Sequence, residues 1–314
     1  MAAGLWAFGF FIGCSSLQSI VIPKNVSKID KYTFSGCSSL KSVVMHSNII
    51  EIDVCAFEGC SSLQSITLPD SITTIRKEAF KNCKSLKSIT IPINLLLIEE
   101  KAFEGCSSLT SVIWNAKKAS TTIIKIPQTP HSYTTRVASP FYDILSQIKS
   151  ITFGDNVEYI PSCLCLGMNN LHYVSISNSV KKIDSDAFRN CSSLTNITIP
   201  NNVKEIGNRA FYYCSSLVNI TISNNVEAIG CYALAGLSDN AQVTILGKIN
   251  SFDNAFGYGR DADGDGKLAI ICYDISNDYV NGTGNVYTAG FFRPADLVTK
   301  QGYIGDVYIG PANY

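Results

Sequence analysis

The amino-acid sequence predicts a repeat solenoid, a right-handed superhelix of ten 23-residue coils. Three observations support this prediction: a cysteine recurs at a constant interval, apolar columns keep the same phase, and short alternating segments end at proline. The coils are expected to be mainly parallel β-structure, closed by short helical or 3-10 turns. A small β-rich C-terminal region is expected to follow over residues 251–314.

Cysteine marks the period of the repeat. Successive cysteines are 23 residues apart in two series, which are Cys14, Cys37, Cys60, Cys83 and Cys106, and then Cys191 and Cys214. The same phase is occupied by Leu145, Met168 and Leu237, and it is interrupted once, by 16 extra residues between Cys106 and Leu145. Two apolar columns lie three and eight residues before the cysteine, and for the irregular coil this places Tyr142 and Val137 in them.

Each coil contains a segment such as residues 63–69, LQSITLP. Ile66 and Leu68 alternate there with Ser65 and Thr67, and an alternation of period two predicts a short strand whose aliphatic side chains face the core. Residues 72–75 predict a second short extended piece on the opposite side of the coil. The Ala-Phe-x-x-Cys sequence is expected to form the turn that closes it.

The cysteine column is interpreted as buried packing rather than as chemistry. Leucine and methionine replace cysteine within it, which suits a small buried hydrophobe and does not suit a nucleophile or a metal ligand. No pair of cysteines has the spacing of a zinc site. Some disulfides between adjacent coils remain an alternative, because neighbouring strands lie about 4.8 Å apart.

The repeat resembles the BspA-type leucine-rich repeat family. The resemblance rests on segments such as CSSLTNITIPNNVKEIGNRAFYYC (191–214) and covers about residues 3–250. It implies a leucine-rich-repeat-like solenoid in a cell-surface or secreted protein that adheres to matrix proteins or other cells. It implies no catalytic residues.

Composition excludes some function classes. Lys plus Arg and Asp plus Glu are 25 each, and a net charge of zero argues against nucleic-acid binding and against electrostatic membrane binding. No apolar run reaches the ~20 residues of a spanning helix. Residues 11–14 are similar to a lipoprotein cleavage box, but no Lys or Arg precedes Cys14, so a signal peptide is not evident and these residues are expected to belong to a coil.

One local motif suggests a cation. Asp261, Asp263 and Asp265, followed by glycine, match the start of a calcium loop. The bidentate glutamate expected at the twelfth position is replaced by Cys272. A calcium ion is therefore one reading, and an Asp/Gly-rich turn that leads into a strand is the other. We expect no other cofactor.

The repeat is interrupted by an insertion expected near residues 115–131, directly after Trp114. Basic and aromatic residues gather around it, a composition that interface hot spots favour. The candidate partner-binding residues are Lys117, Lys118, His131, Tyr133, Arg136, His172 and Tyr173.

These observations predict two domains and a function without catalysis. Residues 1–250 are expected to form the solenoid, and residues 251–314 a β-rich cap or small module. The expected function is binding of an extracellular protein or glycan by a cell-surface or secreted protein. The alternative is a structural spacer that presents another domain of a longer protein.

Overall fold

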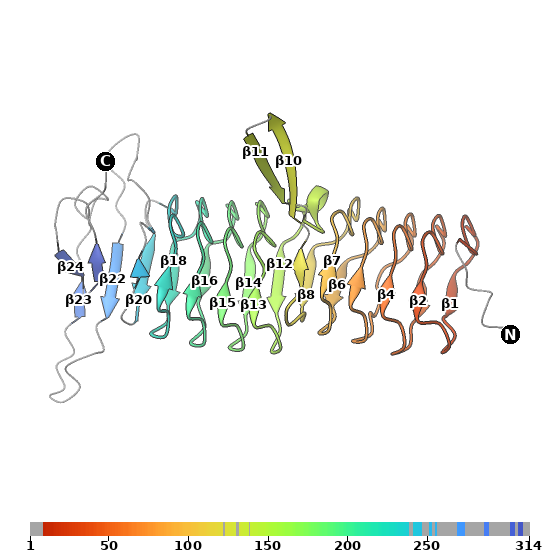
Figure 1. Ribbon diagram of the computed structural model, residues 1–314, viewed down its shortest axis with the longest axis horizontal. Helices are drawn as coiled ribbons and strands as arrows, with labels where there is room; N and C mark the ends of the chain where they lie inside the picture. Colours follow the sequence, from red (N-terminus) through yellow and green to blue (C-terminus); the bar gives the residue numbers. More distant parts are fainter. Residues whose placement is uncertain are drawn as a thin grey trace. The chain divides into compact units, whose positions relative to one another are not determined.

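The computed structural model describes most of the repeat region and a few strands beyond it. The described residues are 9–121, 123–129, 132–137, 139–238, 241–246, 251–252, 255, 269–273, 286–288, 302–304 and 307–309. The chain forms two compact units, Met1–Val157 and Glu158–Tyr314, which we call unit 1 and unit 2. Each unit is a solenoid of stacked β-coils (Figure 1).

In unit 1, most coils contribute one longer strand of three or four residues, which we call the wide strand, and one strand of two residues, which we call the narrow strand. The wide strands are β1 (Ser19–Val21), β3 (Ser42–Val44), β6 (Ser88–Ile91), β8 (Ser111–Trp114) and β12 (Ser150–Phe153). Their pairing is parallel and in register, so that Ser88 lies opposite Ser111 and Ser111 opposite Ser150. The predicted strand at residues 65–68 keeps its buried Ile66 and Leu68 but forms no regular ladder.

The narrow strands form the second side of unit 1. They are β2 (Lys28–Ile29), β4 (Glu51–Ile52), β5 (Thr74–Ile75), β7 (Leu97–Ile98) and β9 (Ser120–Thr121), in one five-stranded parallel sheet. Ile29 pairs with Ile52, and Ile52 with Ile75, so one aliphatic column runs through the stack. This is the isoleucine column expected from the sequence.

The coils close through tight turns rather than helices. Phe34 N–H donates to the carbonyl of Ala56 in the next coil (2.8 Å), and Cys37 N–H donates to the carbonyl of Phe34 within its own coil (3.1 Å). Two residues of the turn are left-handed, Tyr32 (φ 58°) and Gly36 (φ 77°). These residues interrupt the right-handed conformation, so the expected helical turn does not propagate.

Aromatic stacking fills the centre of unit 1. The phenylalanine rings stack in sequence with centroid separations of 5.2–5.4 Å, in the order Phe11, Phe34, Phe57, Phe80, Phe103 and Phe141. The residue in this column of the irregular coil is therefore Phe141, and the expectation of Tyr142 is wrong. Tyr142 instead begins the short 3-10 helix η1 (Tyr142–Ile144).

The insertion is an antiparallel hairpin, β10 (Ile123–Thr129) with β11 (Ser132–Val137), which leaves the stack between β9 and Phe141 (Figure 1). The 23-residue phase continues through β9, because Ser120 and Thr121 pair with Leu97 and Ile98. The insertion therefore begins after Thr121 rather than after Trp114. Val137, expected in the isoleucine column, lies on β11.

Unit 2 repeats the same arrangement. Its wide strands are β14 (Tyr173–Ile176), β16 (Asn196–Thr198), β18 (Asn219–Ile222) and β20 (Gln242–Ile245), and its narrow strands are β13 (Tyr159–Ile160), β15 (Lys182–Ile183), β17 (Glu205–Ile206), β19 (Ala228–Ile229) and β21 (Ser251–Phe252).

Parallel pairing in unit 2 continues beyond residue 250. The strand β22 (Ala269–Tyr273) pairs in parallel with β20, and β23 (Val286–Thr288) pairs antiparallel with β22. A further antiparallel pair is β24 (Gly302–Ile304) with β25 (Val307–Ile309). Within the described residues, no helix is long and apolar enough to cross a membrane.

Candidate binding surfaces

The repeated cysteines hydrogen-bond to the backbone of the neighbouring coil. The thiol of Cys60 donates to the carbonyl of Phe34 at 3.2 Å, and this oxygen also accepts the N–H of Cys37. The same bond, at 3.1–3.2 Å, is made by the thiols of Cys37, Cys83, Cys106, Cys191 and Cys214. The bond thus satisfies the thiol donor, which is buried, at a carbonyl that already accepts a backbone N–H.

Burial favours the protonated thiol at Cys37, Cys60, Cys83, Cys191 and Cys214. It raises the pKa of Cys37 to about 11 and that of Cys214 to about 12, and it also raises the pKa of Cys60 and Cys191. A thiol is nucleophilic or metal-binding only as the thiolate. Cys37, Cys60, Cys83, Cys106, Cys191 and Cys214 are all free and fully buried, and Cys14 is exposed. The predicted role in packing is confirmed for these six residues.

The described part of the chain holds no cluster of three or more His, Cys, Asp or Glu residues that could bind a metal ion. Asp261, Asp263 and Asp265 lie outside the described residues, so calcium binding there stays a prediction.

Ion pairs connect successive coils of unit 1 along its narrow strands. Lys28 Nζ lies 2.8 Å from Asp53 Oδ2 and 3.5 Å from Glu51. Arg76 then bridges Glu51 and Glu99, at 2.9 Å to each. Burial opposes ionisation of Asp53, but its hydrogen bond with Lys28 lowers the net pKa. These charges are paired with each other, so this side of unit 1 offers few free charges to a partner.

The exposed side of the wide strands, which we call the sheet face, is polar and partly self-bonded. In unit 2, Asn219 Nδ2 donates to Asn196 Oδ1 at 2.9 Å across neighbouring coils, and in unit 1 Ser150 bonds to Ser111 at 3.1 Å. Tyr173 stands in the same column as the two asparagines but is 58% exposed. It is the largest side chain of this column, and His172 beside it is also exposed.

The seven candidate partner-binding residues are divided between the units. Lys117 and Lys118 are exposed in unit 1, on the connection from β8 to β9. Tyr133 and Arg136 lie on β11, and His131 falls outside the described residues. His172 and Tyr173 belong to unit 2.

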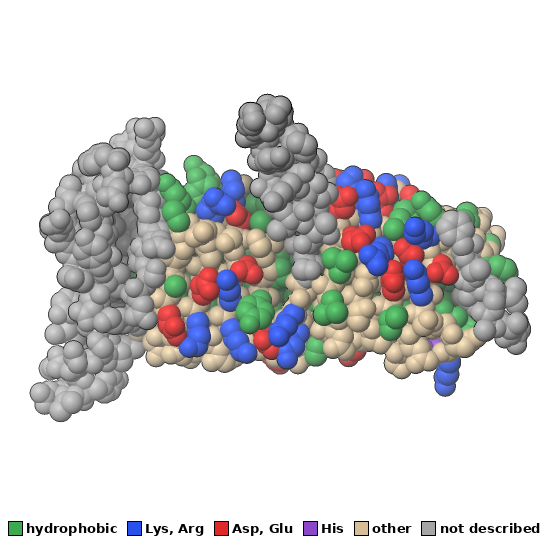
Figure 2. Space-filling model, viewed as in Figure 1, with side chains coloured by type: hydrophobic (Ala, Val, Ile, Leu, Met, Phe, Trp, Pro, Cys, Tyr) green, Lys and Arg blue, Asp and Glu red, His purple; other side chains and the backbone are tan. Residues whose placement is uncertain are grey.

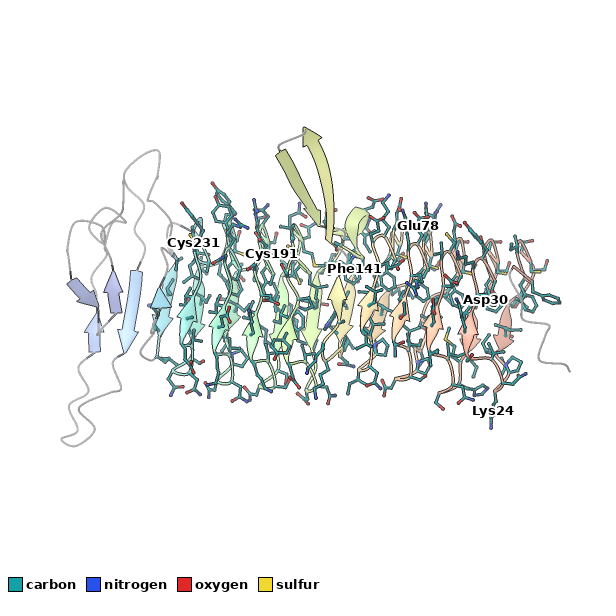
Figure 3. The ribbon with its side chains drawn as sticks, viewed as in Figure 1. Lys24, Asp30, Glu78, Phe141, Cys191 and Cys231 are labelled. Carbon is teal, nitrogen blue, oxygen red and sulfur yellow. The ribbon has the colours of Figure 1, made fainter. Side chains whose placement is uncertain are left out.

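A tyrosine cluster on unit 2 was not anticipated from the sequence. We define it as Arg189, Tyr212, Tyr213 and Tyr232, which lie on the turns that close successive coils. Figure 3 labels Cys231, the residue directly before Tyr232. The centroid of the Tyr212 ring lies 4.3 Å from that of Tyr213 and 6.1 Å from that of Tyr232. The Arg189 guanidinium lies 5.3 Å from the centroid of the Tyr212 ring. Hydrogen bonding to Tyr213 raises the pKa of Tyr212.

A sequence signal for this cluster existed in the position before the repeated cysteine. That position holds glycine or asparagine in eight coils, namely Gly13, Gly36, Gly59, Asn82, Gly105, Gly167, Asn190 and Gly236, and it holds Tyr213 in one.

Comparison with solved structures finds several similar proteins, among them leucine-rich repeat proteins. A leucine-rich repeat protein from Bacteroides ovatus is 25% identical, over 84% of this chain and 86% of that chain, with a TM-score of 0.36. The pneumococcal vaccine antigen PcpA is 22% identical over 81% of this chain and 74% of that chain, with a TM-score of 0.35. A leucine-rich cell surface protein from Faecalibacterium prausnitzii is 22% identical over 82% and 77%, with a TM-score of 0.33. Curated proteins give no match.

The family model for the BspA type leucine rich repeat region matches in 6 copies, over residues 8–128 and 134–259. These ranges cover most of the chain and include the stacked coils, and they are separated at residues 129–133, within the hairpin, where β10 ends and β11 begins. The chain therefore belongs to the BspA-type leucine-rich repeat family.

Proposed function

We propose that this chain is a non-enzymatic binding protein, secreted or held at the cell surface, that recognises a protein or glycan on another cell or in the extracellular matrix. Membership of the BspA-type leucine-rich repeat family supports the proposal, because the resemblance to this family implies adhesion by a cell-surface or secreted protein. The proposed recognition surface in unit 2 is the part of the sheet face around His172 and Tyr173.

The observation that carries this proposal is the exposure of Tyr173. The side chain is 58% exposed on β14, in a column where the next coils have Asn196, Asn219 and Gln242. An aromatic side chain on a regular strand has few rotamers to lose when a partner binds, so it provides contact area at low entropic cost. Asparagine at this position instead bonds along the sheet, as Asn196 does.

The other candidate residues extend the proposal to unit 1. Lys117 and Lys118 are exposed and would contribute donors to an acidic group of the partner. Tyr133 and Arg136 of β11, together with His131, are proposed as contacts made by the hairpin, since loops on rigid scaffolds often bind partners.

Binding to immobilised matrix proteins and to a glycan array tests this function. The wild type is compared with Tyr173→Asn, which installs the asparagine of the neighbouring coils, and with Tyr159→Ser as the control. Tyr159 is also exposed, at 37%, but lies on a narrow strand. We expect Tyr173→Asn to weaken binding about 10-fold, as loss of a hot-spot side chain does, and Tyr159→Ser to leave it unchanged. Equal binding by all three proteins would refute the role of the sheet face.

The bonds within the sheet face favour a second candidate, a structural spacer that presents another domain. Asn196 with Asn219, and Ser111 with Ser150, use their polar groups on each other rather than offering them to a partner. A spacer predicts no binding on any matrix protein or glycan, together with a partner domain elsewhere in the full-length protein.

A further inference from the structure

The tyrosine cluster of unit 2 is the second place where the repeat pattern is broken at an exposed position. Figure 2 shows hydrophobic side chains in green beside basic ones in blue along the upper edge of unit 2. Tyr213 is 53% exposed there, while Tyr212 and Tyr232 are half-buried.

The backbone of Tyr213 has the left-handed conformation that favours glycine. Its φ is 56°, and glycine occupies the equivalent position in the next coil, Gly236, with φ 70°. The left-handed conformation is unfavourable for a residue with a side chain. A Cβ on Gly236 would lie 2.7 Å from Cδ1 of Tyr213, so the ring rests against the bare backbone of that glycine. Tyrosine is therefore held at a position where glycine would be more stable.

The contacts of Tyr213 hold it at the surface rather than in the core. Half of its side chain faces solvent, and it makes an edge contact with Tyr212 at 4.3 Å rather than entering the core. Residues that keep an unfavourable backbone conformation at the surface are often functional. The cluster is also rigid, because Tyr212 is fixed between Arg189 and the rings of Tyr213 and Tyr232. Little side-chain entropy would be lost on binding.

Charge indicates the kind of partner. Arg209 bonds to both carboxylate oxygens of Asp186 (2.9 and 3.0 Å), and Arg189 shares the same carboxylate at 3.2 Å. Two guanidinium groups therefore face one carboxylate, which leaves a net charge of +1 beside the rings. The equivalent turn positions of unit 1 have a net negative charge, because they hold three acidic and two basic residues. These are Glu58, Glu78 and Glu104, with Lys81 and Lys101.

We propose that the tyrosine cluster is a docking surface for an acidic segment of a partner protein, in which a carboxylate faces the two arginines and an apolar side chain packs on the Tyr213 ring. Tyr and Arg are the residues most enriched among interface hot spots. The inference rests on the proposed function only in assuming a binding protein, and it uses a surface separate from Tyr173.

Selection from a phage-displayed dodecapeptide library tests the proposal. Enriched peptides are synthesised, and their affinity is measured by fluorescence anisotropy for the wild type, Tyr213→Gly and the control Tyr159→Ser. We expect the enriched peptides to contain Asp or Glu, to bind Tyr213→Gly at least ~10-fold more weakly, and to bind the control normally. Their affinity should also fall with added salt, since the carboxylate faces the partly exposed side chains of Arg189 and Arg209.

Thermal stability separates binding from a structural role. Tyr213→Gly relieves the left-handed conformation, so its melting temperature should equal or exceed that of the wild type. A lower melting temperature would show that the tyrosine is there for packing and would overturn the proposal. The same holds if the enriched peptides lack acidic residues, if they bind Tyr213→Gly within about 2-fold of the wild type, a difference too small for a hot spot, or if no peptide is enriched. Tyr213→Asn, which copies Asn190, serves as a second variant. Failure of these tests leaves the Tyr173 experiment unaffected.

Discussion

Replacing Cys83 with alanine is expected to lower the free energy of unfolding by about 2 kcal/mol. The Cys83 side chain is fully buried, and loss of its sulfur removes an apolar atom worth about 1 kcal/mol. The thiol also donates to the Phe57 carbonyl at 3.2 Å, which contributes roughly another 0.5–1 kcal/mol. That carbonyl keeps its second bond, from the N–H of Cys60 at 3.2 Å, so the loss is partial.

Urea denaturation followed by circular dichroism measures this difference. Cys14→Ala is the matched control, because Cys14 occupies the same repeat position but is exposed. We expect the control to change the free energy of unfolding by less than ~0.5 kcal/mol, as surface substitutions usually do. Equal effects of the two substitutions would refute the view that burial, rather than repeat position, makes the cysteine stabilising.

Thiol labelling provides an independent readout of the same reasoning. A water-soluble maleimide should modify Cys14 in the folded protein and should modify Cys83 only after unfolding, because burial raises the pKa of Cys83 and excludes the reagent. Labelling of Cys83 in the folded protein at the rate of Cys14 would show that the column is accessible and would contradict the structural role.

Three further predictions concern charge, pH and the hairpin. Arg76→Gln should lower the free energy of unfolding by about 0.5–1 kcal/mol in low salt and by less in 1 M NaCl, because its ion pairs with Glu51 and Glu99 are partly exposed; urea titrations at both salt concentrations measure it. Burial raises the pKa of Cys214 to about 12, above the ~8.5 of an unfolded thiol, so its contribution to stability is complete below pH ~8.5 and is lost as pH rises toward 12. Cys214→Ala should accordingly flatten the fall of stability with alkaline pH, and an unchanged slope would contradict this. Deletion of residues 123–137 should leave the melting temperature within ~3 °C, a change of about 1 kcal/mol, because it restores the 23-residue spacing between Phe103 and Phe141 and leaves η1 in place; loss of the folded state would contradict it.

The periodic part of the fold was predictable because one coil places the same constraints on every other coil. Ile52 and Phe57 each stack on residues 23 positions away, and Cys60 bonds to the backbone of the same neighbouring coil, so a column that is apolar in the sequence is buried in the structure. The turn conformation was not predictable. The left-handed position five residues before the cysteine holds Tyr32, Cys55 and other residues with no preference for that conformation, because bonds between coils fix it.

In the coil interrupted by the hairpin, the predicted position of the phenylalanine column was wrong by one residue, and the residue spacing explains why. Phe103 and Phe141 are 38 residues apart, an excess of 15 over the period, and the hairpin Ile123–Val137 accounts for that excess. Ser111 and Ser150 are 39 apart, so one more residue enters after Phe141, where η1 lies. Counting from the cysteines gives only the sum of both additions. It therefore placed Tyr142 in the column that Phe141 occupies.

The same logic explains which candidate surface the sequence could and could not reveal. Tyr173 was visible from the sequence because its column lies on a predicted strand, where the outward direction follows from alternation. Tyr213 lies in a turn, where no alternation separates outward from inward residues. Its significance depends on knowing that the position is left-handed and that Gly236 leaves room for the ring. In the turns of a repeat protein, a departure from the column composition identifies a functional candidate only after the structure shows which backbone conformation the position requires.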